Sequence, residues 1–309
     1  MYYFIVNPAS HSGNGMHIWK KQIEPALKRL QVSYQSFLSD TPGGATQLAT
    51  QILNEAPERP VRLVVLGGDG TVNEALNGIR NSGDVILGYI PTGSSNDLAR
   101  DLGLPKKPLD NLKLILSGSS IRPMDYGIVT YADGSSRRFL TSCGIGYDAA
   151  VCEEVQRSTL KPTLNKFGLG KLAYLSTALK QLVAAKEVAG SLTLDDTSAI
   201  PLSNMRFIAS MNHRFEGGGF MFAPDAKDTD GILNLCVVDN ISKSKILIAL
   251  PSAFKGKHFR FKGVTPYSAK KIHIDLQKPM WVHTDGEVEK QASSITITCV
   301  PNSLMFLRP

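Results

Sequence analysis

The chain of 309 residues carries 34 Lys and Arg against 27 Asp and Glu, a formal net charge of +7, and 42% of its residues are hydrophobic. This composition excludes intrinsic disorder, collagen and coiled coil as the main architecture. The length exceeds what one hydrophobic core usually serves, so we expect two domains. Apolar runs fall far short of the roughly 20 residues that span a bilayer, and the first residues lack the basic region of a signal peptide. We therefore expect a cytoplasmic protein.

Strand and helix alternate over residues 1–122. Strands are expected at Tyr2–Val6, Val32–Leu38, Val61–Leu66 and Val85–Ile90, and residues 18–30 and 45–53 carry apolar side chains at helical spacing. The continuous β-branched run 61–66 is typical of a strand that is covered on both faces of a parallel sheet. This order predicts an open, doubly wound, Rossmann-like α/β domain.

Short alternating strands dominate residues 123–299. They are expected at Ser191–Leu194, Arg206–Met211, Ile232–Val238, Lys271–Asp275, Pro279–His283 and Ser294–Cys299, with one long helix at Lys171–Ala185. Short strands with frequent turns predict a second domain built as an antiparallel β-sandwich. Gly144-Ile145-Gly146 follows a strand in this domain, but no βαβ unit continues after it, so we do not expect a dinucleotide site there.

The strongest motif is Leu66-Gly67-Gly68-Asp69-Gly70-Thr71-Val72-Asn73-Glu74. Glycines at the carboxyl end of a buried parallel strand let backbone N–H groups approach phosphate, and the following helix N-terminus favours negative charge. A carboxylate repels bare phosphate, so Asp69 makes most sense as a group that holds Mg²⁺ beside the phosphates. Alternatively, Thr71 and Glu74 form a capping box and are structural. We favour a nucleotide site.

A second loop, Pro91-Thr92-Gly93-Ser94-Ser95-Asn96-Asp97, also follows a strand and opens a helix. Alone it would be read as a helix cap, with Ser94 as the capping residue and Asp97 at the third helical position. Two such loops at successive strand ends converge on one crevice, which is where open α/β sheets bind ligands.

Four segments together resemble the diacylglycerol kinase catalytic family. They are the opening NPAS with its glycines, the run GGDGTVNE, the run PTGSSNDLAR and the late Thr284-Asp285-Gly286-Glu287. The chain is most similar to the bacterial soluble lipid kinases, which include sphingosine- and ceramide-kinase-like relatives. GGDGT alone is shared with NAD kinases and phosphofructokinases. The resemblance implies that residues 1–122 bind ATP, that residues 123–299 bind the lipid, and that residues 300–309 return to the first domain.

The resemblance also implies a set of ATP-binding residues. The matching positions are Asn7, Pro8, Ala9, Ser10, Thr41, Gly67, Gly68, Asp69, Gly70, Thr71, Val72, Asn73, Gly93, Ser94, Asn96 and Asp97. The N-terminal loop reads NPASHSGNG, two residues longer before its final glycines than the usual NPxSGxG. Either Ser10 or Ser12 can therefore occupy the family's serine position.

Metal and catalytic residues follow from the same resemblance. Asp69, Asp97 and Asp125 match an acidic network linked to Mg²⁺. A structural Mg²⁺ is implied at the Asp230 carboxylate and the carbonyls of Lys227 and Ile232. Glu287 matches the proposed general base. Independently of the resemblance, Asp285 lies two residues earlier on an expected alternating strand, so we expect it to point the same way and to hold the base or a metal in place.

These late residues also have a plainer interpretation. Asp225, Asp228 and Asp230 with Gly231 could bind a hard cation through oxygens, but the residues alone favour a solvated turn between two strands. The Asp285–Glu289 segment lies between alternating strands and would normally be a hairpin turn. The six histidines show no metal-ligand spacing.

Basic residues gather in two stretches that contain no acid. The stretch 155–186 holds Arg157, Lys161, Lys166, Lys171, Lys180 and Lys186, and the stretch 240–274 holds Lys243, Lys245, Lys255, Lys257, Arg260, Lys262, Lys270 and Lys271. Phe254, Phe259 and Phe261 interleave with the second stretch. This pattern suits an anionic membrane surface; a solvated face without a partner is the alternative. No nucleic-acid-binding module is present, so we expect no nucleic-acid partner.

The sequence therefore predicts an ATP- and Mg²⁺-dependent kinase of diacylglycerol or a similar hydroxylated lipid, peripherally associated with the inner membrane face. The alternatives are an NAD kinase-like small-molecule kinase and a non-catalytic lipid or nucleotide sensor. A homodimer is compatible with the sequence, because C₂ symmetry is the commonest oligomeric arrangement.

Overall fold

The computed structural model describes residues 1–118, 120–157 and 187–309. They form two compact units, one of residues 1–125 and 302–309 and the other of residues 126–301. The sequence predicts these borders at 122 and 299. Both borders lie inside strands, β5 (Ile121–Tyr131) and β13 (Glu287–Leu307), so no change of local structure marks them in the sequence.

The N-terminal unit contains a parallel sheet with strand order β2-β1-β3-β4. The strands are β1 (Tyr2–Val6), β2 (Tyr34–Leu38), β3 (Val61–Gly67) and β4 (Val85–Pro91). Residues Met305 and Phe306 at the end of β13 add a further parallel pair beside β4. The order reverses between β1 and β3, which is the point at which such sheets bind ligands.

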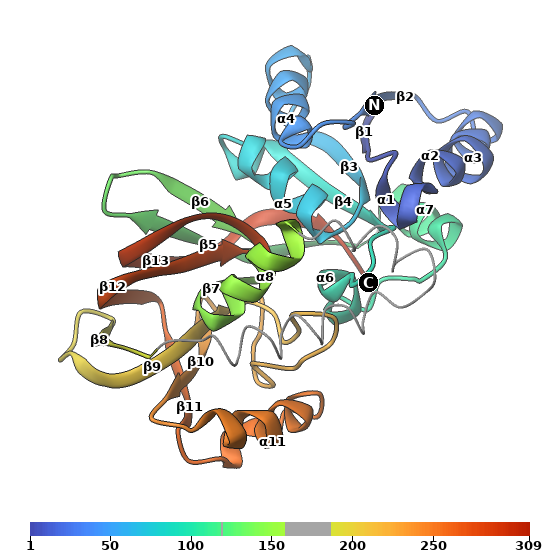
Figure 1. The fold of residues 1–309 in the computed structure, drawn as a ribbon. Coiled ribbons are helices and arrows are strands. Elements are labelled where there is room, and N and C mark those ends of the chain that lie inside the picture. The colour runs from blue at the N-terminus through green and yellow to red at the C-terminus, as the bar shows by residue number, and fades with distance from the viewer. Residues whose placement is uncertain (119, 158–186) are drawn as a thin grey trace. The chain divides into compact units, whose positions relative to one another are not determined.

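Helices cover both faces of this sheet, which is the doubly wound arrangement that the sequence predicts (Figure 1). One layer contains α1 (Ser10–Gly13), α2 (Gly15–Ile18), the π-helical turn η1 (Trp19–Ile23), α3 (Glu24–Arg29) and α7 (Pro108–Ser117). The other contains α4 (Gly44–Glu55) and α5 (Asp69–Gly78). Short elements η2 (Ser82–Asp84) and α6 (Asp97–Asp101) flank β4.

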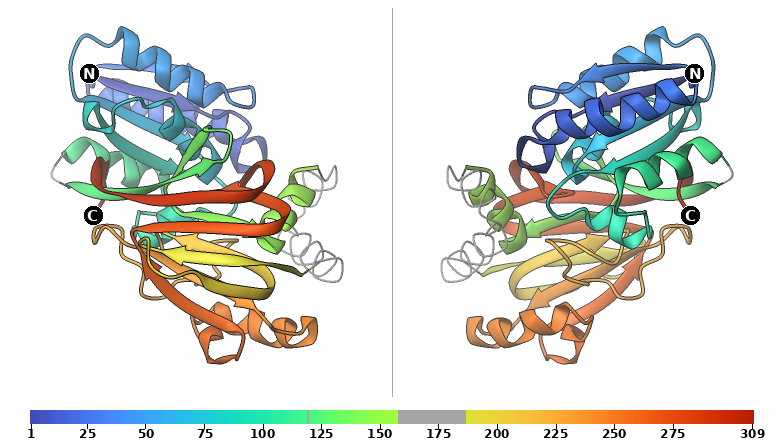
Figure 2. Two further views of the ribbon diagram at one scale, coloured as in Figure 1. Left: turned by 90° about the vertical axis from the view of Figure 1, so that its left-hand side faces the viewer. Right: turned by 90° about the vertical axis from the view of Figure 1, so that its right-hand side faces the viewer.

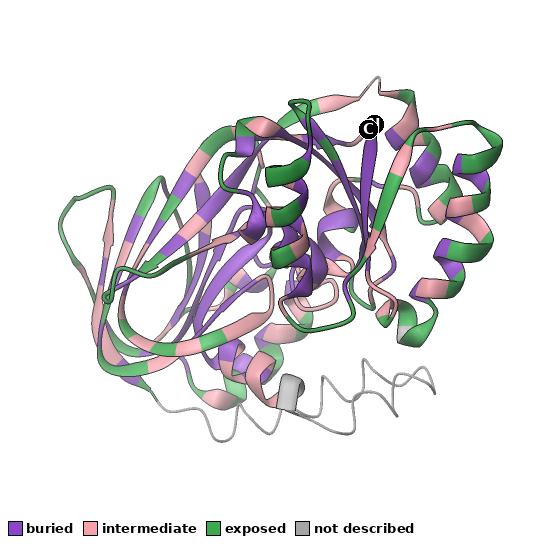
Figure 3. Ribbon diagram, turned by 90° about the horizontal axis from the view of Figure 1, so that it is seen from above, coloured by how far each residue is buried: buried purple, intermediate pink, exposed green. Residues whose placement is uncertain are grey.

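Burial along β1 explains the apolar pattern of the first residues. All five residues of β1 are buried, and β3 and β4 are also buried over most of their length, whereas β2 is not, as the colours of Figure 3 show. Tyr2, Phe4 and Val6 pack with Trp19 and Leu27 on one side of the sheet. Tyr3 and Ile5 alternate to the other side. A strand buried on both faces is apolar throughout, as predicted for β3.

The C-terminal unit is an antiparallel sandwich, which confirms the predicted fold class. Its main order is β11-β10-β9-β7-β12-β13, with β8 paired to both β12 and β9 and a β5–β6 hairpin. The strands are β6 (Ser136–Phe139), β7 (Ser142–Gly146), β8 (Val188–Leu194), β9 (Ile200–Met211), β10 (Leu233–Asp239), β11 (Val264–Ala269) and β12 (Lys271–Thr284). The helical elements are α8 (Tyr147–Arg157), α11 (Lys243–Ala253) and η3 (His258–Arg260).

Two predictions for this unit need comment. The strands expected at 271–275 and 279–283 are a single strand, β12, whose pairing with β13 shifts between Asp275 and Met280. An irregularity in register therefore looked like a loop in the sequence. The helix expected at 171–185 lies outside the described residues. Among the described residues, no helix combines the length and apolar character that crossing a membrane requires.

Candidate active site

Three loops of the N-terminal unit meet at the carboxyl ends of β1, β3 and β4. Because these strands are parallel, all three loops leave the sheet at the same edge. The N–H of Asn7 donates to the carbonyl of Leu66 at 2.8 Å, and the N–H of Thr92 donates to the carbonyl of Gly67 at 2.7 Å. Each loop is therefore tied to its neighbour by a backbone hydrogen bond. We call this set the nucleotide edge, after the expectation from the sequence.

Asp69 lies at the start of α5 with both carboxylate oxygens engaged. The hydroxyl of Tyr89 donates to Oδ1 at 3.2 Å, and the N–H of Asp97 donates to Oδ2 at 2.9 Å. Burial, and then the neighbouring Asp69 carboxylate, raise the pKa of Tyr89 well above its usual value. The phenol therefore stays protonated, and its one proton lies between Oδ1 of Asp69 and Oδ1 of Asn96, which is 3.1 Å from the hydroxyl. Sequence analysis missed Tyr89 in this role, because it reads as an apolar residue of β4.

The two glycine loops are in van der Waals contact. A Cβ on Gly93 would lie 2.6 Å from the Cα of Gly68, so a side chain at Gly93 would push the loops apart. Asn96, in the left-handed region with φ of 50°, accepts from the N–H of Gly93 at 2.8 Å and donates to its carbonyl at 2.9 Å. This local ring of hydrogen bonds accounts for the Gly-x-x-Asn spacing of the second loop.

The N-terminal loop is connected to both glycine loops by side chains. The Oγ of Ser10 lies 2.8 Å from the carbonyl of Asn7 and 2.8 Å from the Oγ1 of Thr92. The amide of Asn7 donates to the Oγ1 of Thr71 at 2.9 Å, and its Oδ1 accepts from the N–H of Ala9 at 3.0 Å. The side chain of Ser12 lies outside the described residues. These contacts favour Ser10 as the serine that joins the loops.

Other predicted nucleotide residues occupy different environments. Val72 and Asn73 are fully buried, so neither side chain faces solvent. Thr41 follows β2 at the same edge of the sheet and is exposed, with its carbonyl accepting from the N–H of Gly44 at 3.0 Å. Of these three residues, Thr41 alone has a solvent-accessible side chain.

The capping interpretations of both motifs are wrong. Helix α5 begins at Asp69 with Gly68 as its N-cap, so Thr71 already lies inside the helix. Glu74 instead accepts from the N–H groups of Gly43 at 3.0 Å and Ala45 at 3.1 Å, and thereby caps α4. In the second loop Asn96, not Ser94, is the N-cap of α6, and Asp97 is the first helical residue rather than the third.

The structure brings together two of the three aspartates of the predicted magnesium network. Asp97 is buried, contacts Asp69 through its backbone N–H and forms an ion pair with Arg100. Asp125 is also fully buried, and its carboxylate accepts from the N–H of Asn302 at 2.6 Å. Asp125 thus binds the segment 302–309 to the N-terminal unit.

In the C-terminal unit, Asp285 and Gly286 form a two-residue turn between β12 and β13. Both have positive φ, 52° and 85°, as a type I′ hairpin requires, so the hairpin interpretation is confirmed. The Asp285 carboxylate accepts from three backbone N–H groups, those of Leu140 at 2.9 Å, Thr141 at 2.7 Å and Ser142 at 3.0 Å. Glu287, the first residue of β13, is half-buried directly after this anchored turn.

A buried cluster that the sequence analysis missed lies beside this turn. Nε2 of His283 is 2.9 Å from a carboxylate oxygen of Glu216 and 3.3 Å from one of Asp148. Residue 144, which packs against these side chains, has room only for glycine, because a Cβ at this position would overlap both Asp148 and His283. The three residues come from a helix start, a loop and a strand, so their spacing in the sequence carries no signal.

The hydrogen bond to Nδ1 of His283 indicates whether this cluster is suited to bind a metal ion. The N–H of Gly286 donates to Nδ1 of His283 at 3.2 Å, so Nδ1 offers a lone pair and the proton of the neutral ring lies on Nε2. A histidine that binds a metal shows the reverse pattern, donating from its second nitrogen. Burial raises the pKa of Glu216. The cluster therefore links Glu216 and Asp148 to the turn before Glu287.

The predicted structural metal segment forms an exposed turn. The Asp230 carboxylate accepts from the N–H of Ile232 at 3.0 Å, and Gly231 has a φ of 73°. Asp230 and Lys227 are exposed, whereas Gly231 is buried. The solvated turn and the cation site both remain compatible with these contacts.

The chain matches two known domain families over nearly its whole length. Residues 1–129 match the diacylglycerol kinase catalytic domain, and residues 141–308 match the YegS C-terminal NAD kinase beta sandwich-like domain. "Putative lipid kinase YtlR" of Bacillus subtilis is 30% identical over 93% of this chain and 93% of its own. A diacylglycerol kinase of Mycobacterium tuberculosis is 30% identical over 86% of this chain and 83% of its own.

Solved structures agree in fold. A structure described as "a putative diacylglycerol kinase from Bacillus anthracis" has a TM-score of 0.76 at 23% identity, covering 100% of this chain and 96% of that one. An ATP complex of an NAD kinase from Archaeoglobus fulgidus is more distant, with a TM-score of 0.54 at 16% identity over 100% of this chain and 94% of its own. The matches to the two family models and the relatives at 30% identity show that the chain belongs to the diacylglycerol kinase family and is a lipid kinase, a phosphotransferase with an alcohol acceptor.

Proposed function

We propose that this kinase uses ATP and Mg²⁺ to phosphorylate the hydroxyl of diacylglycerol, giving phosphatidic acid, or that of a related lipid. One observation carries the nucleotide part of the proposal. Asp69 is held between Tyr89 and Asp97 at the head of two glycine loops that touch each other. A carboxylate in a fixed orientation beside backbone N–H donors suits a phosphate chain with its metal ion.

The residues of the nucleotide edge fit ATP and Mg²⁺ chemically. Helix α5 has glycine as its N-cap, so no side chain caps its first-turn N–H groups, and those groups suit a phosphate. Asp69 and Asp97 would hold the metal ion, with Asn7, Ser10 and Thr41 at the rim. When bound, ATP supplies the phosphoryl group, and Mg²⁺ offsets the charge that spreads over it during transfer.

Glu287 is proposed as the base that accepts the proton of the lipid hydroxyl. A carboxylate is a weak base for an alcohol in water, and its half-buried position after the turn reduces hydration. Asp285 has a positioning role in this proposal, because its oxygens are occupied by three backbone N–H groups. His283 fixes the same turn through the N–H of Gly286.

A structural Mg²⁺ in the segment 227–232 is a further part of the proposal. The Asp230 carboxylate would bind it with the carbonyls of Lys227 and Ile232. The positive φ of Gly231 allows the sharp turn that such a site needs. Oxygen ligands from a short exposed loop are the type of donor that Mg²⁺ accepts.

We also propose that the protein associates peripherally with an anionic membrane on the cytoplasmic side. Residues 240–274 contain no acid, and Lys255, Lys257, Arg260 and Lys262 are exposed. The other acid-free stretch lies outside the described residues from 158 onward. A homodimer is proposed only on general grounds of symmetry.

A parallel transfer assay tests the function. Labelled ATP with Mg²⁺ would be offered diacylglycerol in detergent, total lipid extract and NAD in separate reactions. We expect transfer to diacylglycerol or to a lipid of the extract, and none to NAD. Transfer to NAD alone would identify a small-molecule kinase, and ATP binding without transfer to any acceptor would identify a sensor.

A further inference from the structure

Helix α11 carries apolar residues on opposite faces. Ile246, Ala249 and Ala253 are buried at the spacing of one helical face. Leu247 and Ile248 lie on the other side, with 44% and 66% of their surface exposed. A helix that is apolar all round normally lies buried, so this outer face indicates a surface that binds an apolar partner.

The exposed side chains form one stripe. Leu247, Ile248, Pro251 and Phe254 follow the i, i+1, i+4, i+7 spacing of a helix face. Three of them, Leu247, Ile248 and Phe254, are among the seven large hydrophobic residues exposed in the described parts of the chain. We call these four residues the outer stripe. It lies at an end of the C-terminal unit, where α11 is drawn in orange in Figure 2.

Phe254 joins the outer stripe to the core. Phe254 is 51% exposed, yet its ring stacks on Phe220 with centroids 4.1 Å apart, and Phe220 stacks on Phe222 at 5.6 Å. Phe220 and Phe222 are buried in the core of this unit. Phe254 therefore has little rotamer freedom left to lose on binding, which favours association.

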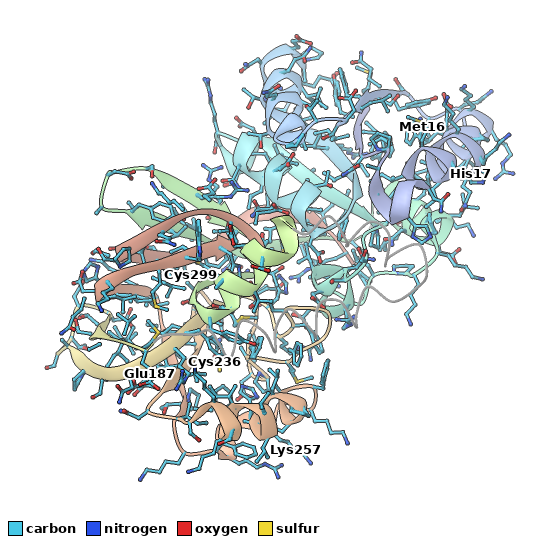
Figure 4. All side chains as sticks on the ribbon, viewed as in Figure 1. Met16, His17, Glu187, Cys236, Lys257 and Cys299 are labelled. Carbon is cyan, nitrogen blue, oxygen red and sulfur yellow. The ribbon has the colours of Figure 1, made fainter. Side chains whose placement is uncertain are left out.

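Positive charge borders the outer stripe. Lys245 precedes it, Lys255 and Lys257 follow it, and all three are exposed; Figure 4 labels Lys257 beside α11. No acid occurs between Asp239 and Asp275. Long basic side chains next to apolar ones reach the headgroups while the apolar groups enter the acyl boundary. A nucleic acid would use the charge but not the apolar stripe.

We propose that the outer stripe inserts into the interfacial layer of an anionic bilayer, with Lys245, Lys255 and Lys257 on its headgroups. This names the element that docks the kinase on its lipid substrate, and in that respect it rests on the proposed function. The insertion itself needs neither ATP nor diacylglycerol. It can therefore be measured apart from phosphoryl transfer.

The test is co-sedimentation of the full chain with phosphatidylcholine vesicles that contain or lack phosphatidylglycerol. Ile248→Ser removes the most exposed side chain of the stripe and should weaken binding to the anionic vesicles about tenfold. Leu30→Ser is the matched control, because Leu30 is 55% exposed beside Lys28 and Arg29 but lies outside α11. It should bind as the wild type does. Equal binding of Ile248→Ser and wild type would overturn the proposal.

A second pair of variants tests the charge. Lys255→Glu with Lys257→Glu should reduce binding to anionic vesicles strongly at low salt, and the difference should shrink as salt screens the surface. Lys106→Glu with Lys107→Glu, two exposed residues of the N-terminal unit, should have little effect. Equal losses for both pairs would show that net charge alone, and not α11, drives binding.

Two further outcomes separate this inference from its alternatives. A dimer that forms with rising concentration, is lost in Ile248→Ser and comes without vesicle binding would show that the stripe binds a second copy, which overturns insertion. Ile248→Ser should keep the wild-type rate on detergent-dispersed diacylglycerol. A wild type that binds vesicles but transfers no phosphate would refute the proposed function and leave the insertion standing.

Discussion

The nucleotide edge and the β12–β13 hairpin are held in place by different means. At the nucleotide edge, backbone hydrogen bonds and the contact of Gly68 with Gly93 join adjacent loops, and the side chains of Asn7 and Ser10 add further links. At the hairpin, side chains from distant segments converge on one turn. Asp285 binds residues 143 to 145 positions away, and His283 contacts Asp148 at a separation of 135.

This difference has consequences for substitution. At the nucleotide edge a side chain at Gly93 would push the loops apart, whereas the exposed side chain of Thr41 can change without loss of the fold. A turn held by buried polar side chains depends on each of them, because an unpaired buried polar group costs about 1–3 kcal/mol. We therefore expect substitutions at the nucleotide edge to act mainly on chemistry, with a small loss of stability, and those at the hairpin to act on chemistry and stability together.

The largest effect is expected for Asp69→Asn. Phosphoryl transfer should fall roughly 1,000- to 100,000-fold, the range for loss of a charge-stabilising group in this chemistry. The carboxylate of Asp69 has two acceptor oxygens, one for the hydroxyl of Tyr89 and one for the N–H of Asp97, whereas the amide of asparagine has only one. One hydrogen bond is lost, so the melting temperature should drop by a few degrees for about 1 kcal/mol. Single-turnover transfer and thermal melting measure both quantities.

The control for this prediction is Asp110→Asn, an exposed aspartate of α7 in the same unit. It should change neither quantity. If Asp69→Asn transferred phosphate at a rate near that of the wild type, Asp69 could not be a metal ligand, and the nucleotide edge would lose its proposed role.

Glu287→Gln should lower the transfer rate roughly 100- to 10,000-fold, because the amide keeps size and hydrogen bonding but cannot accept a proton. ATP affinity should stay near that of the wild type, since Glu287 is assigned to the lipid acceptor. Glu289→Gln, two residues along β13 and exposed, is the matched control. A normal rate for Glu287→Gln with lipid in excess would rule out this base and weaken the comparison between the two regions.

Parts of both regions were predictable from the sequence. The nucleotide edge follows from local patterns, because its loops come directly after apolar strands and carry their own glycines. The hairpin turn also follows from a local pattern, Asp-Gly between alternating strands. The family resemblance, and not the spacing, singled out Glu287.

The long-range contacts could not be predicted in this way. Glu74 looked like half of a capping box, yet it caps α4, some thirty residues earlier in the chain. His283 had no histidine or carboxylate at ligand spacing, because Asp148 and Glu216 reach it only after the sandwich has formed. Tertiary packing decides such partners, and one sequence does not contain that information in its local periodicity.

Asp230→Ala should lower stability by an amount that depends on Mg²⁺. A metal ion that binds only the folded state stabilises it by linkage, so added Mg²⁺ should raise the melting temperature of the wild type and leave that of the variant unchanged. Asp225→Ala, in the same exposed segment, is the control and should respond to Mg²⁺ as the wild type does. Equal responses of Asp230→Ala and wild type would leave the solvated turn as the correct interpretation.

The smallest effect, and the most specific for the hairpin, is expected for Glu216→Gln. Burial raises the pKa of Glu216, so the folded state retains its proton at a pH where the unfolded state has lost it. The free energy of unfolding then falls as pH rises above the ordinary pKa of the carboxyl and through the raised pKa, because the folded state binds more protons.

Glutamine resembles the protonated acid, and its Oε1 can accept from Nε2 of His283. The variant should therefore match the wild type in melting temperature at low pH and exceed it as pH rises, whereas the exposed control Glu58→Gln should follow the wild type throughout. A variant that is less stable than the wild type at every pH would mean that Glu216 is held ionised, with a protonated His283, and the hydrogen bond from Gly286 to Nδ1 would then have to be abandoned.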